Sequence, residues 1–550
     1  MESSNNNKTM YQALKEAALD FPFGTAIYYQ GKKISYRSFL KKIDKMAAKL
    51  QYDLGIKAGD VILLSQPNIP DVLILFYAIN KIGAIANMVH PFTPYNQIAA
   101  IYKKTKSKYA FLFEQRVAKE VEAYRESAVH CYVTRVENYL PFFKKVVYHF
   151  MNRKIRKKLG SYIKFKGFNY IHKLPRVRKK SVEVENLTRQ TAVLLHSGST
   201  TGAPKTICIS NDAFNFTSYK ACEFVDCTPK DIRGTMMLTV LPSFHGFGLC
   251  MAMHAPLINR FGVGLVPKFS TKDVVDIMNH NKMSVIIGIP KIYEALLDDP
   301  KFVNNKRLKY LKVCFCGGDS MNVSLKERWD KALKADSHNR QVFEGYGLTE
   351  AISVNCVNTY AHNRKGSIGY PASGVKFKII DDKENEVSTG ELGEICILSG
   401  SAMVKYFEDE KATRATFTKD GYLKTGDIGY IDADGFIFFK QRKKRVIKVS
   451  GVGVFPSEVE QLVESVPGVE ACCAIRIPDP KLVNAIKIYV VAKFYDEQGM
   501  RRAIMAKCQQ YLIRWSVPKE IEFVNELPYT LLGKVDFVKI QKEEDAKRGL

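Results

Sequence analysis

Long apolar runs are missing from this chain of 550 residues. A membrane-spanning helix requires about 18 uncharged apolar residues, and the most apolar stretch, residues 72–85, is interrupted by Asn80 and Lys81. Fixed-period repeats and low-complexity tracts are missing as well, and the first residues lack the hydrophobic segment of a secretory signal. These absences argue against an integral membrane protein and a repeat architecture, so we expect a cytoplasmic protein.

Clustered cysteines are missing too. The twelve cysteines are scattered, and the close pairs Cys314/Cys316 and Cys472/Cys473 lack the spacing of a metal-ligand array. This distribution predicts free, mostly buried thiols in a reducing compartment. A chain of this length has room for two to four domains of roughly 150 residues each.

Acidic residues are absent from one long segment. Residues 141–180 hold fourteen Lys or Arg and no Asp or Glu, which is more than half of the net charge of +27. Apolar residues recur in this segment at helical spacing, opposite basic ones. The apolar set is Phe143, Val146, Val147, Phe150 and Met151, and the basic set is Lys144, Lys145, Arg153, Lys154 and Lys157.

Three interpretations of residues 141–180 stand side by side. A cationic helix with an apolar stripe is typical of a segment that lies on an anionic membrane surface, which would place the protein at the inner face of the membrane. Nucleic acid is the rival partner for such charge, although we expect no nucleic acid here. The third interpretation is a solvated surface excursion whose apolar stripe packs on its own domain.

Short apolar strands alternate with helical patterns over most of the chain. A hairpin at residues 26–36 and a helix at residues 39–50 come first. Further strands are predicted at residues 61–65, 85–89, 110–113, 236–241, 285–289 and 313–316. Such alternation predicts a parallel sheet covered by helices.

The pattern changes after Val375. Short strands separated by Gly and Asp turns predict a small antiparallel barrel or sheet at residues 377–438. A dense basic stretch, residues 440–445, then predicts an exposed connection. Beyond it lie about a hundred residues that predict a compact α+β module able to fold by itself.

A loop rich in glycine and hydroxyl residues separates two predicted strands, residues 191–196 and 206–210. The loop contains Ser197, Gly198, Ser199, Thr200, Thr201, Gly202 and Lys205. Because strands flank it on both sides, we predict a hairpin, and the loop does not match the Walker pattern. Its N–H groups and hydroxyls can still surround phosphate oxygens, with the lysine adding charge. A plain surface turn is the alternative.

Two shorter elements carry side chains that suit a nucleotide. In Tyr346-Gly347-Leu348-Thr349-Glu350 the ring can stack on a base, and the hydroxyl and carboxylate can hold Mg²⁺. In Thr425-Gly426-Asp427 a carboxylate behind a glycine turn can accept both hydrogen bonds of a ribose diol. Each match is weak alone, since an Asp in a turn usually serves only the turn.

The order and spacing of these elements resemble the acyl-adenylate-forming (AMP-binding) enzyme superfamily, and most of all its fatty acyl-CoA synthetases. The resemblance covers nearly the whole chain. Further matches are residues 55–60, Pro67-Asn68, Pro242-Ser243-Phe244-His245-Gly246, Gly317-Gly318, residues 390–396, Arg442, Lys448-Val449-Ser450-Gly451 and residues 528–534, which include Gly533-Lys534.

The resemblance implies an α/β fold with two parts. A large N-terminal domain, residues 1–441, would contain two helix-covered α/β sheets plus a small β-barrel. It would be hinged to a small mobile α+β C-terminal domain, residues 442–550. The implied activity is that of an ATP-dependent, AMP-forming acid–thiol ligase, an acyl-CoA synthetase, in which the small domain rotates between two half-reactions.

The resemblance also assigns roles to single residues. Lys534 would be the catalytic lysine against the α-phosphate and the substrate carboxylate, with Thr349 and Glu350 beside it. The implied ligand contacts are Ser197 to Gly202 and Lys205 for the phosphates, Thr201 and Glu350 for Mg²⁺, Gly317, Gly318, Tyr346 and Gly347 for adenine, Asp427 and Arg442 for ribose, Lys448, Ser450 and Gly451 for the CoA step, and Phe244, His245, Gly246 and Gly288 for the acyl pocket. His245 would act as a gate and not as a base, and an ordinary hydrogen-bonded histidine is the alternative.

Several positions depart from the family pattern, including the residue before Gly533-Lys534, where the usual small hydroxyl residue is missing. Ser199 and Thr206 stand where glycines are usual around the phosphate loop, and an added β-carbon predicts weaker ATP binding. Gln441 replaces a glycine before the hinge arginine, and Arg445 replaces an Asp or Lys at the pivot. We therefore expect the changes at Gln441 and Arg445 to affect the domain rotation more than adenylation.

Apolar residues dominate the expected acyl pocket. Val240, Leu241 and Phe244 lie near the gate, and residues 286–289 supply a wall with a small gap. An uncharged tail is therefore expected, which indicates a medium- or long-chain fatty acid with CoA as acceptor. The alternatives are an aryl-CoA ligase, a stand-alone ligase that loads a carrier-protein phosphopantetheine, and a non-catalytic membrane or nucleic-acid binder.

Overall fold

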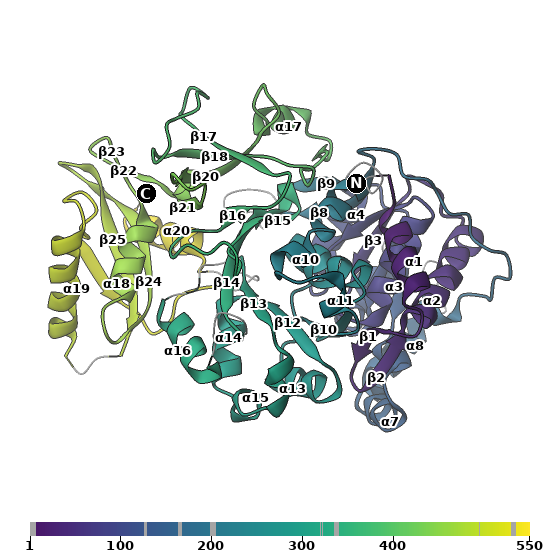
Figure 1. Cartoon of the computed structure of the whole chain (residues 1–550). Coiled ribbons are helices and arrows are strands. Elements are labelled where there is room, and N and C mark those ends of the chain that lie inside the picture. The colour runs from purple at the N-terminus through teal and green to yellow at the C-terminus, as the bar shows by residue number, and fades with distance from the viewer. Residues whose placement is uncertain are drawn as a thin grey trace. The chain divides into compact units, whose positions relative to one another are not determined.

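The chain divides into two compact units (Figure 1). A computed structural model describes residues 7–125, 129–162, 168–197, 205–318, 321, 323–334, 340–493, 496–529 and 535–549. The first unit comprises residues 1–197, 205–376 and 398–417, and the second comprises residues 377–397 and 418–550. Among the described residues, no helix is both long and apolar enough to cross a membrane.

An eight-stranded sheet forms one half of the first unit. Its order is β19-β9-β8-β4-β3-β5-β6-β7. The strands are β3 (Val61–Ser65), β4 (Ile85–Met88), β5 (Tyr109–Phe113), β6 (Cys131–Thr134), β7 (Phe168–Tyr170), β8 (Thr191–His196), β9 (Thr206–Ser210) and β19 (Lys405–Tyr406). The strands from β8 to β7 pair in parallel, whereas β9 pairs antiparallel with β8 and β19. Every residue of β3 is buried, as expected for a parallel sheet covered on both faces.

A nine-stranded sheet forms the other half. Its order is β16-β15-β14-β13-β12-β10-β11-β1-β2. The strands are β1 (Thr25–Tyr29), β2 (Lys32–Ser35), β10 (Met236–Thr239), β11 (Gly262–Leu265), β12 (Met283–Gly288), β13 (Val313–Cys316), β14 (Val342–Leu348), β15 (Ser353–Val357) and β16 (Tyr370–Pro371). The strands from β1 to β14 through the middle are parallel, so their carboxyl ends share one edge of the sheet.

Helices cover both sheets of the first unit (Figure 1). They are α1 (Met10–Asp20), α2 (Tyr36–Ala48), α3 (Pro70–Lys81), α4 (Tyr95–Lys104), α5 (Glu114–Lys119), α6 (Val121–Arg125), α7 (Phe142–Met151), α8 (Arg153–Tyr162), α9 (Asn211–Ser218), α10 (Ala221–Phe224), α11 (Pro229–Ile232), α12 (Ala255–Ile258), α13 (Thr271–His280), α14 (Pro290–Leu297), α15 (Pro300–Val303), α16 (Val323–Leu333) and α17 (Glu410–Thr416). Residues of α13, α14 and α16 pack with β10, β12 and β13 around the fully buried Trp329. All twelve residues of α3 are buried.

The second unit contains a four-stranded sheet and an α+β module. The sheet has the order β17-β18-β20-β21, with β17 (Lys376–Ile380), β18 (Gly393–Leu398), β20 (Leu423–Ile431) and β21 (Ile437–Arg442). The module contains β22 (Ile447–Val449), β23 (Val452–Val454), β24 (Val469–Asp479), β25 (Val483–Ala492), β26 (Glu520–Phe523), α18 (Pro456–Glu464), α19 (Glu497–Tyr511) and α20 (Phe537–Lys547).

The predicted α/β fold class is confirmed, including the small C-terminal α+β module. All twelve cysteines are free and ten are buried, as predicted. Two helices, α1 and α20, were not predicted from the sequence. The expected exposed connection at residues 440–445 is wrong in one respect, because Gln441 is only 1% exposed. By compactness, the four-stranded sheet groups with the C-terminal module, whereas a hinge between residues 441 and 442 stays a prediction.

Candidate active site

The glycine- and hydroxyl-rich loop joins two antiparallel strands, as predicted. β8 and β9 pair through His196 and Thr206 as their last partners before the loop. The Ser197 amide donates to the Lys205 carbonyl at 2.9 Å, and the Lys205 amide donates to the Ser197 hydroxyl oxygen at 3.0 Å. The neck of the hairpin is therefore closed by two hydrogen bonds. Gly198, Ser199, Thr200, Thr201 and Gly202 lie outside the described residues.

A tyrosine connects the loop lysine with the carboxylate of the second element. The Lys205 ammonium lies 4.1 Å from the ring centroid of Tyr406. The Tyr406 hydroxyl donates to the Glu350 carboxylate at 3.0 Å. Burial, with the Glu350 charge adding to it, raises the pKa of Tyr406 well above its ordinary value, so the hydroxyl keeps its proton and donates. Sequence reasoning missed Tyr406, which lies 56 residues beyond Glu350.

The segment from Tyr346 to Glu350 ends one strand and begins a short turn. Tyr346 and Gly347 belong to β14, and Thr349 and Glu350 to a 3₁₀ turn, Thr349–Ala351. A β-carbon on Gly347 would lie 1.4 Å from the Ser353 carbonyl oxygen, so only glycine fits at this position. The backbone reverses at Ser353, whose φ is +76°.

The expected aromatic gate lies close to the same turn. A β-carbon on Gly246 would lie 3.0 Å from Ile352 and about 4.0 Å from the Thr349 methyl group. Phe244 packs edge-on against His90 with centroids 4.5 Å apart. The structure thus brings the gate residues Phe244 to Gly246 and the Thr349 turn into one neighbourhood of the first unit.

The segment expected to form the gate is held in place by a buried asparagine. The Asn68 side-chain amide donates to the carbonyls of Thr239, Val240 and Leu241, and its oxygen accepts the Ser243 N–H at 3.0 Å. One side chain therefore fixes the backbone on both sides of Pro242. His245 is half-buried, and its Nδ1 lies 3.4 Å from the Phe247 amide nitrogen.

The glycine pair and the small pocket residue also lie together. The Gly317 amide donates to the Gly288 carbonyl at 3.1 Å. A β-carbon on Gly317 would lie 2.7 Å from the Phe247 ring, and Gly318 has a φ of +81°. Gly288 and Gly317 mark the carboxyl ends of β12 and β13, the edge where open parallel sheets bind ligands.

His196, the last residue of β8, was not predicted as a site residue. Its Nε2 lies 2.7 Å from the Asn87 side-chain oxygen and its Nδ1 lies 3.3 Å from the Thr206 hydroxyl. Burial, together with the Lys104 charge, lowers the pKa of His196 to about 4. Thr206 is itself buried, so its β-carbon lies among core residues beside His196.

The two residues expected at the ribose are neighbours in the second unit. Asp427 in β20 and Arg442 in β21 are direct partners across the sheet, and Arg442 Nε lies 3.8 Å from Asp427 Oδ1. The Asp427 side chain is 10% exposed and the Arg442 side chain is 59% exposed. Thr425 fixes the turn before them, since its hydroxyl donates to the Ile395 carbonyl at 2.7 Å.

The two unusual hinge residues each have a half-buried partner inside the second unit. The Gln441 side-chain oxygen accepts the Ser457 N–H at 2.9 Å and the Ser457 hydroxyl at 2.8 Å. Arg445 forms a bidentate ion pair with Glu460 and stacks on the Phe537 ring. Neither residue serves as a plain exposed linker position.

Ser450 and Gly451 form the two-residue turn of a β-hairpin. Val449 in β22 pairs with Val452 in β23, and the φ values of Ser450 and Gly451 are +49° and +82°. Two positive φ values in succession are the geometry of a tight hairpin turn. Both residues are exposed, and so is Lys448.

Lys534 lies outside the described residues, but the residues on either side of its segment are described. Tyr529 and Val535 form an antiparallel bridge, and the Asp536 amide donates to the Pro528 carbonyl at 2.8 Å. Val535 packs on a buried cluster that includes Leu527 and Ile540. The segment that carries Lys534 therefore begins and ends on the core of the C-terminal module.

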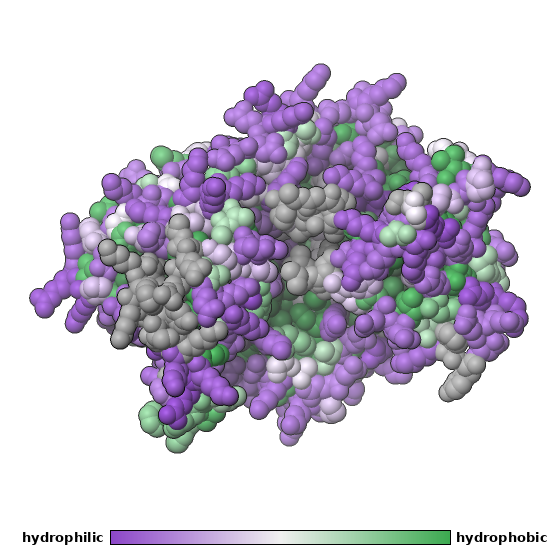
Figure 2. Space-filling model, turned by 180° about the vertical axis from the view of Figure 1, so that it is seen from behind, coloured by the Kyte–Doolittle hydropathy of each residue, from purple (hydrophilic) through white to green (hydrophobic). Residues whose placement is uncertain are grey.

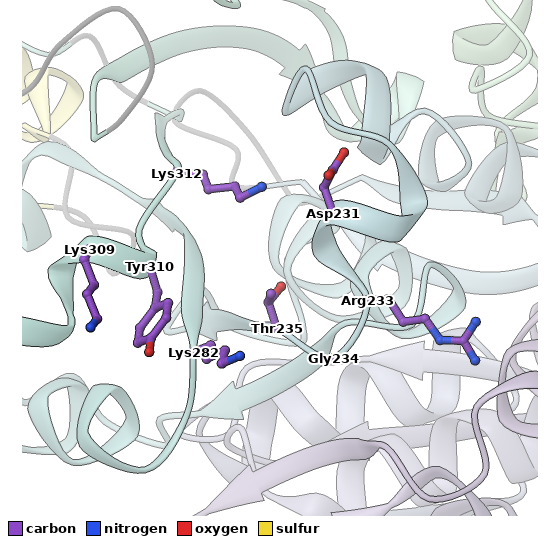
Figure 3. Close-up of a pocket in the computed structure, with 8 residues that line it drawn as sticks. All are labelled: Asp231, Arg233, Gly234, Thr235, Lys282, Lys309, Tyr310 and Lys312. Carbon is purple, nitrogen blue, oxygen red and sulfur yellow. The ribbon is translucent and has the colours of Figure 1, made fainter.

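A pocket of about 310 Å³ lies elsewhere in the first unit. Its lining residues are Asp231, Arg233, Gly234, Thr235, Lys282, Lys309, Tyr310 and Lys312. Figure 3 shows Lys312 extending towards Asp231, while Arg233 extends away from the other side chains. These residues precede β10, β12 and β13, so the pocket lies at the amino ends of the strands, opposite Gly288 and Gly317. It is therefore not the candidate active site.

Known proteins resemble the chain over nearly its full length. The AMP-binding enzyme model matches residues 14–407, and the AMP-binding enzyme C-terminal domain model matches residues 458–534. A long-chain-fatty-acid–CoA ligase of Bacillus subtilis (strain 168) is 28% identical, with 98% of this chain and 95% of that protein covered. A probable 4-coumarate–CoA ligase 3 of Dictyostelium discoideum is 27% identical, with coverage of 92% and 89%.

A solved structure shows the same fold. ATP-bound MatB from Rhodopseudomonas palustris superposes with a TM-score of 0.82 at 20% identity, covering 98% of this chain and 99% of that one. ATP and CoA as the nucleotide and the thiol agree with the family and with these relatives. Since its model matches most of the residues, this chain belongs to the AMP-binding enzyme family and is an AMP-forming acid–CoA ligase.

Proposed function

We propose that the protein activates a medium- or long-chain fatty acid and transfers its acyl group to CoA. A carboxylate oxygen of the acid attacks the α-phosphorus of ATP, and the bond to the bridging oxygen of the β-phosphate breaks, releasing pyrophosphate. The deprotonated CoA thiol then attacks the acyl carbon, and AMP leaves with the electrons of the broken C–O bond. The observation that carries this proposal is the continuous contact from Lys205 through Tyr406 to Glu350 at the neck of the phosphate-loop hairpin.

The phosphate side of the nucleotide is assigned to this neck. Lys205 supplies positive charge, and the loop from Ser197 to Gly202 supplies N–H and hydroxyl donors. Tyr346, Gly347, Gly317 and Gly318 are proposed to border the adenine. This arrangement is supported by the position of Gly317 after β13, at the carboxyl edge of the sheet where open parallel sheets bind ligands.

The ribose is assigned to the pair in the second unit. The Asp427 carboxylate is largely enclosed, whereas Arg442 is mostly exposed. An ionised carboxylate only accepts hydrogen bonds and has two oxygens to do so. The Asp427 carboxylate is therefore suited to accept one hydrogen bond from each hydroxyl of a diol.

Glu350 and Thr201 are proposed to hold Mg²⁺. The fit rests on Glu350, whose carboxylate is oriented by the Tyr406 hydroxyl at 3.0 Å, the kind of supporting hydrogen bond that carboxylate ligands have in metal sites. When bound, Mg²⁺ would neutralise phosphate charge during the displacement. Tyr406 orients the Glu350 carboxylate through its hydroxyl and contacts the Lys205 ammonium through its ring.

Lys534 is proposed to stabilise the negative charge that develops in adenylation. Removal of a donor that stabilises the transition state typically lowers the reaction rate by ~10²–10³-fold. The Tyr529–Val535 bridge supports this role because it anchors both ends of the segment. Ser450 and Gly451 at the hairpin tip, with Lys448 next to them, are proposed to serve the CoA step after rotation about residues 441–442.

The fatty acid follows from the residues around the gate. Leu241, Ile286 and Ile287 are buried apolar residues, and Val240 and Phe244 are partly buried. An apolar wall favours an uncharged tail. Several relatives bear the name long-chain-fatty-acid–CoA ligase. A second candidate is an aryl acid, which is favoured by the probable 4-coumarate–CoA ligase among the relatives.

Trapping of the adenylate by hydroxylamine tests the proposal. The protein would be incubated with Mg-ATP and acids of 6 to about 18 carbons, and with an aryl acid, each with and without CoA. Hydroxamate formation from the longer fatty acids, replaced by acyl-CoA and AMP when CoA is present, is the expected result. If only the aryl acid forms a hydroxamate, the proposed substrate is wrong but the proposed ligase activity stands. If no acid forms a hydroxamate, the ligase proposal is overturned.

Two variants and one acceptor complete the experiment. Lys534→Ala is expected to lose hydroxamate formation, whereas Lys539→Ala, an exposed lysine on α20, serves as the matched control. A holo carrier protein offered in place of CoA separates the carrier-loading alternative. If the carrier protein takes the acyl group from the adenylate and CoA does not, the acceptor is the carrier phosphopantetheine instead of CoA. Full turnover by Lys534→Ala would show that this lysine is not needed for catalysis and would contradict its proposed role.

A further inference from the structure

Helix α7 presents an apolar face to solvent. None of its ten residues is buried. Phe142, Phe143, Phe150 and Met151 are 68–82% exposed, and Val147 is 57% exposed. Figure 2 shows a green patch at the lower left, where α7 of Figure 1 lies after the half-turn between the two views. The interpretation that this stripe packs on its own domain is therefore wrong.

The polar face of α7 is the one that contacts the protein. Lys144, Tyr148 and Asn152 follow one another at a spacing of four residues, so they share one side of the helix. Lys144 donates to the Gln30 carbonyl at 3.1 Å, and Tyr148 donates to the Glu114 carboxylate at 2.7 Å. Asn152 is buried.

A surface helix ordinarily buries its apolar stripe and exposes its charges. In α7 the order is reversed, because the hydrogen-bonding side chains face the body and the phenylalanines face away. The neighbouring helix α8 follows the ordinary rule. Its Leu159 is fully buried with Val117, and Ile155 packs on the same cluster. The exposed apolar stripe thus distinguishes α7 from α8, the helix that follows it.

Basic side chains surround the apolar face. Lys145, Arg153, Lys154 and Lys157 are exposed. No carboxylate is available to them within residues 141–180, since that segment contains no Asp or Glu. Among the described residues, none of these four forms an ion pair with an acidic group. The surface therefore combines an outward apolar stripe with unneutralised positive charge.

We propose that α7 and the start of α8 dock on the surface of an anionic lipid bilayer, with the apolar stripe inserted among the lipid headgroups and acyl chains. A short amphipathic helix binds in this way when apolar burial and attraction to anionic lipid act together. A nucleic acid would neutralise the charge but leave Val147 and Met151 in water. A second copy of the chain would bring two basic borders together across an isologous interface, and like charges would oppose it.

The docking does not depend on the identity of the acid, so it can fail or hold independently of the proposed function. If both hold, the ligase would meet an amphiphilic substrate at the surface that contains it. The two can be separated because vesicle binding needs neither ATP nor CoA, and turnover of a short water-soluble acid needs no vesicle.

Flotation with vesicles tests the inference on the full chain. Wild-type protein is expected to float with vesicles that contain phosphatidylglycerol and to bind pure phosphatidylcholine vesicles at least ~10-fold less. The double variant Phe143→Ser/Phe150→Ser should lose vesicle binding, whereas Phe23→Ser, at a phenylalanine that is 81% exposed elsewhere in the first unit, should keep it.

A charge series uses the same measurement. The triple variant Arg153→Gln/Lys154→Gln/Lys157→Gln should lose binding to anionic vesicles by ~10-fold or more. The matched triple variant Lys301→Gln/Lys331→Gln/Lys411→Gln removes the same charge from exposed lysines on other helices and should bind like wild type. If both triple variants lose vesicle binding to the same extent, binding depends only on the net charge of the protein, and the proposal is overturned.

Two further outcomes would also overturn it. One is binding of single-stranded nucleic acid without vesicle binding. The other is a dimer in analytical ultracentrifugation that dissociates in Phe143→Ser/Phe150→Ser while wild type ignores vesicles. Because the substituted side chains are exposed, the variants should keep the wild-type Tm, and hydroxamate formation with a short acid confirms that each is folded.

Discussion

The ammonium group of Lys205 lies over the ring of Tyr406, with 4.1 Å between the nitrogen and the ring centroid. Tyr406 comes from β19, which pairs with β9, the strand that follows the glycine- and hydroxyl-rich loop. One residue therefore touches the loop lysine through its ring and the Glu350 carboxylate through its hydroxyl. Tyr406 thus links Lys205 and Glu350, which lie 145 positions apart in the sequence.

Tyr406→Phe separates the two contacts. The variant keeps the ring under Lys205 but loses the hydrogen bond to Glu350. We expect pyrophosphate exchange to fall ~10- to 100-fold, as when a supporting partner of a metal ligand is lost, and higher Mg²⁺ to restore part of it. Tyr406→Leu should lose more, because the cation–π contact goes as well. An unchanged Mg²⁺ dependence in Tyr406→Phe would contradict the proposed role of Glu350.

Gly347 and Gly345 form a matched pair in β14. A β-carbon on Gly347 would lie 1.4 Å from a backbone oxygen, whereas one on Gly345 would lie 3.2 Å from the end of a valine side chain. Gly347→Ala should therefore destabilise the protein by about 3 kcal/mol through overpacking. Gly345→Ala should cost less than about 1 kcal/mol. Urea unfolding compares the two, and similar losses would argue against the close approach at Gly347.

Gln441 and Ser457 connect the end of β21 with the start of α18. Removal of the buried Gln441 side chain leaves the half-buried Ser457 N–H without its acceptor. We expect Gln441→Ala to lower the free energy of unfolding by about 1–3 kcal/mol. The double variant with Ser457→Ala should lose less than the sum of the single variants. Strict additivity would show that the two side chains do not interact in solution.

His196 gives stability a specific pH dependence. Its folded pKa, about 4, lies below the unfolded value near 6.5. The unfolded chain therefore binds more protons between these values, and stability falls as pH decreases from about 6.5 to about 4. Above that window the contribution is complete. In His196→Asn this part of the pH dependence should disappear, which urea unfolding between pH 4.5 and 7.5 would measure, in steps of about 0.5.

Glu544 gives stability a pH dependence of the same sign at lower pH. Burial alone would raise its pKa, but hydrogen bonds from Tyr489, Arg548 and Lys487 outweigh burial and lower the pKa to about 2. Its stabilisation is present above the unfolded pKa of about 4.3 and is lost as pH falls towards 2. Glu544→Gln should be destabilised at pH 7, whereas Glu543→Gln, at an exposed position, should behave like wild type. Equal stability of the two variants at pH 7 would contradict this account.

Local patterns predicted the elements that position the site. The strands around the glycine- and hydroxyl-rich loop, residues 191–196 and 206–210, match β8 and β9 to the residue, because apolar runs with clear ends define where a strand begins and ends. Helix α1 could have been predicted as well. Thr9 and Gln12 form a capping box, and the buried residues from Met10 to Ala18 recur at helical spacing. Helix α20 buries only Ile540 and Glu544, so its apolar pattern is faint.

Pairings between distant residues could not be predicted. Nothing near Tyr406 in the sequence indicates Glu350 as its partner, since the contact exists only after β19 pairs with β9. The same holds for Asn87 and Thr206 around His196, and for Gln441 with Ser457. A single sequence specifies which residues prefer a strand or a helix, whereas these contacts depend on which strands become neighbours. The outward face of α7 was equally undetermined, because periodicity defines a stripe but not the side that it faces.

The two hydrogen bonds between Ser197 and Lys205 have a consequence for how this enzyme can change over generations. They join backbone and one small hydroxyl at the entrance of the loop, and the Tyr529–Val535 bridge does the same around Lys534. Because the entropic cost of closing a loop depends on its length and on where its ends meet, substitutions between such anchors leave that cost unchanged. If the proposed function holds, variation of the catalytic chemistry in these two short segments would cost little folding stability, which suits them to a directed-evolution library.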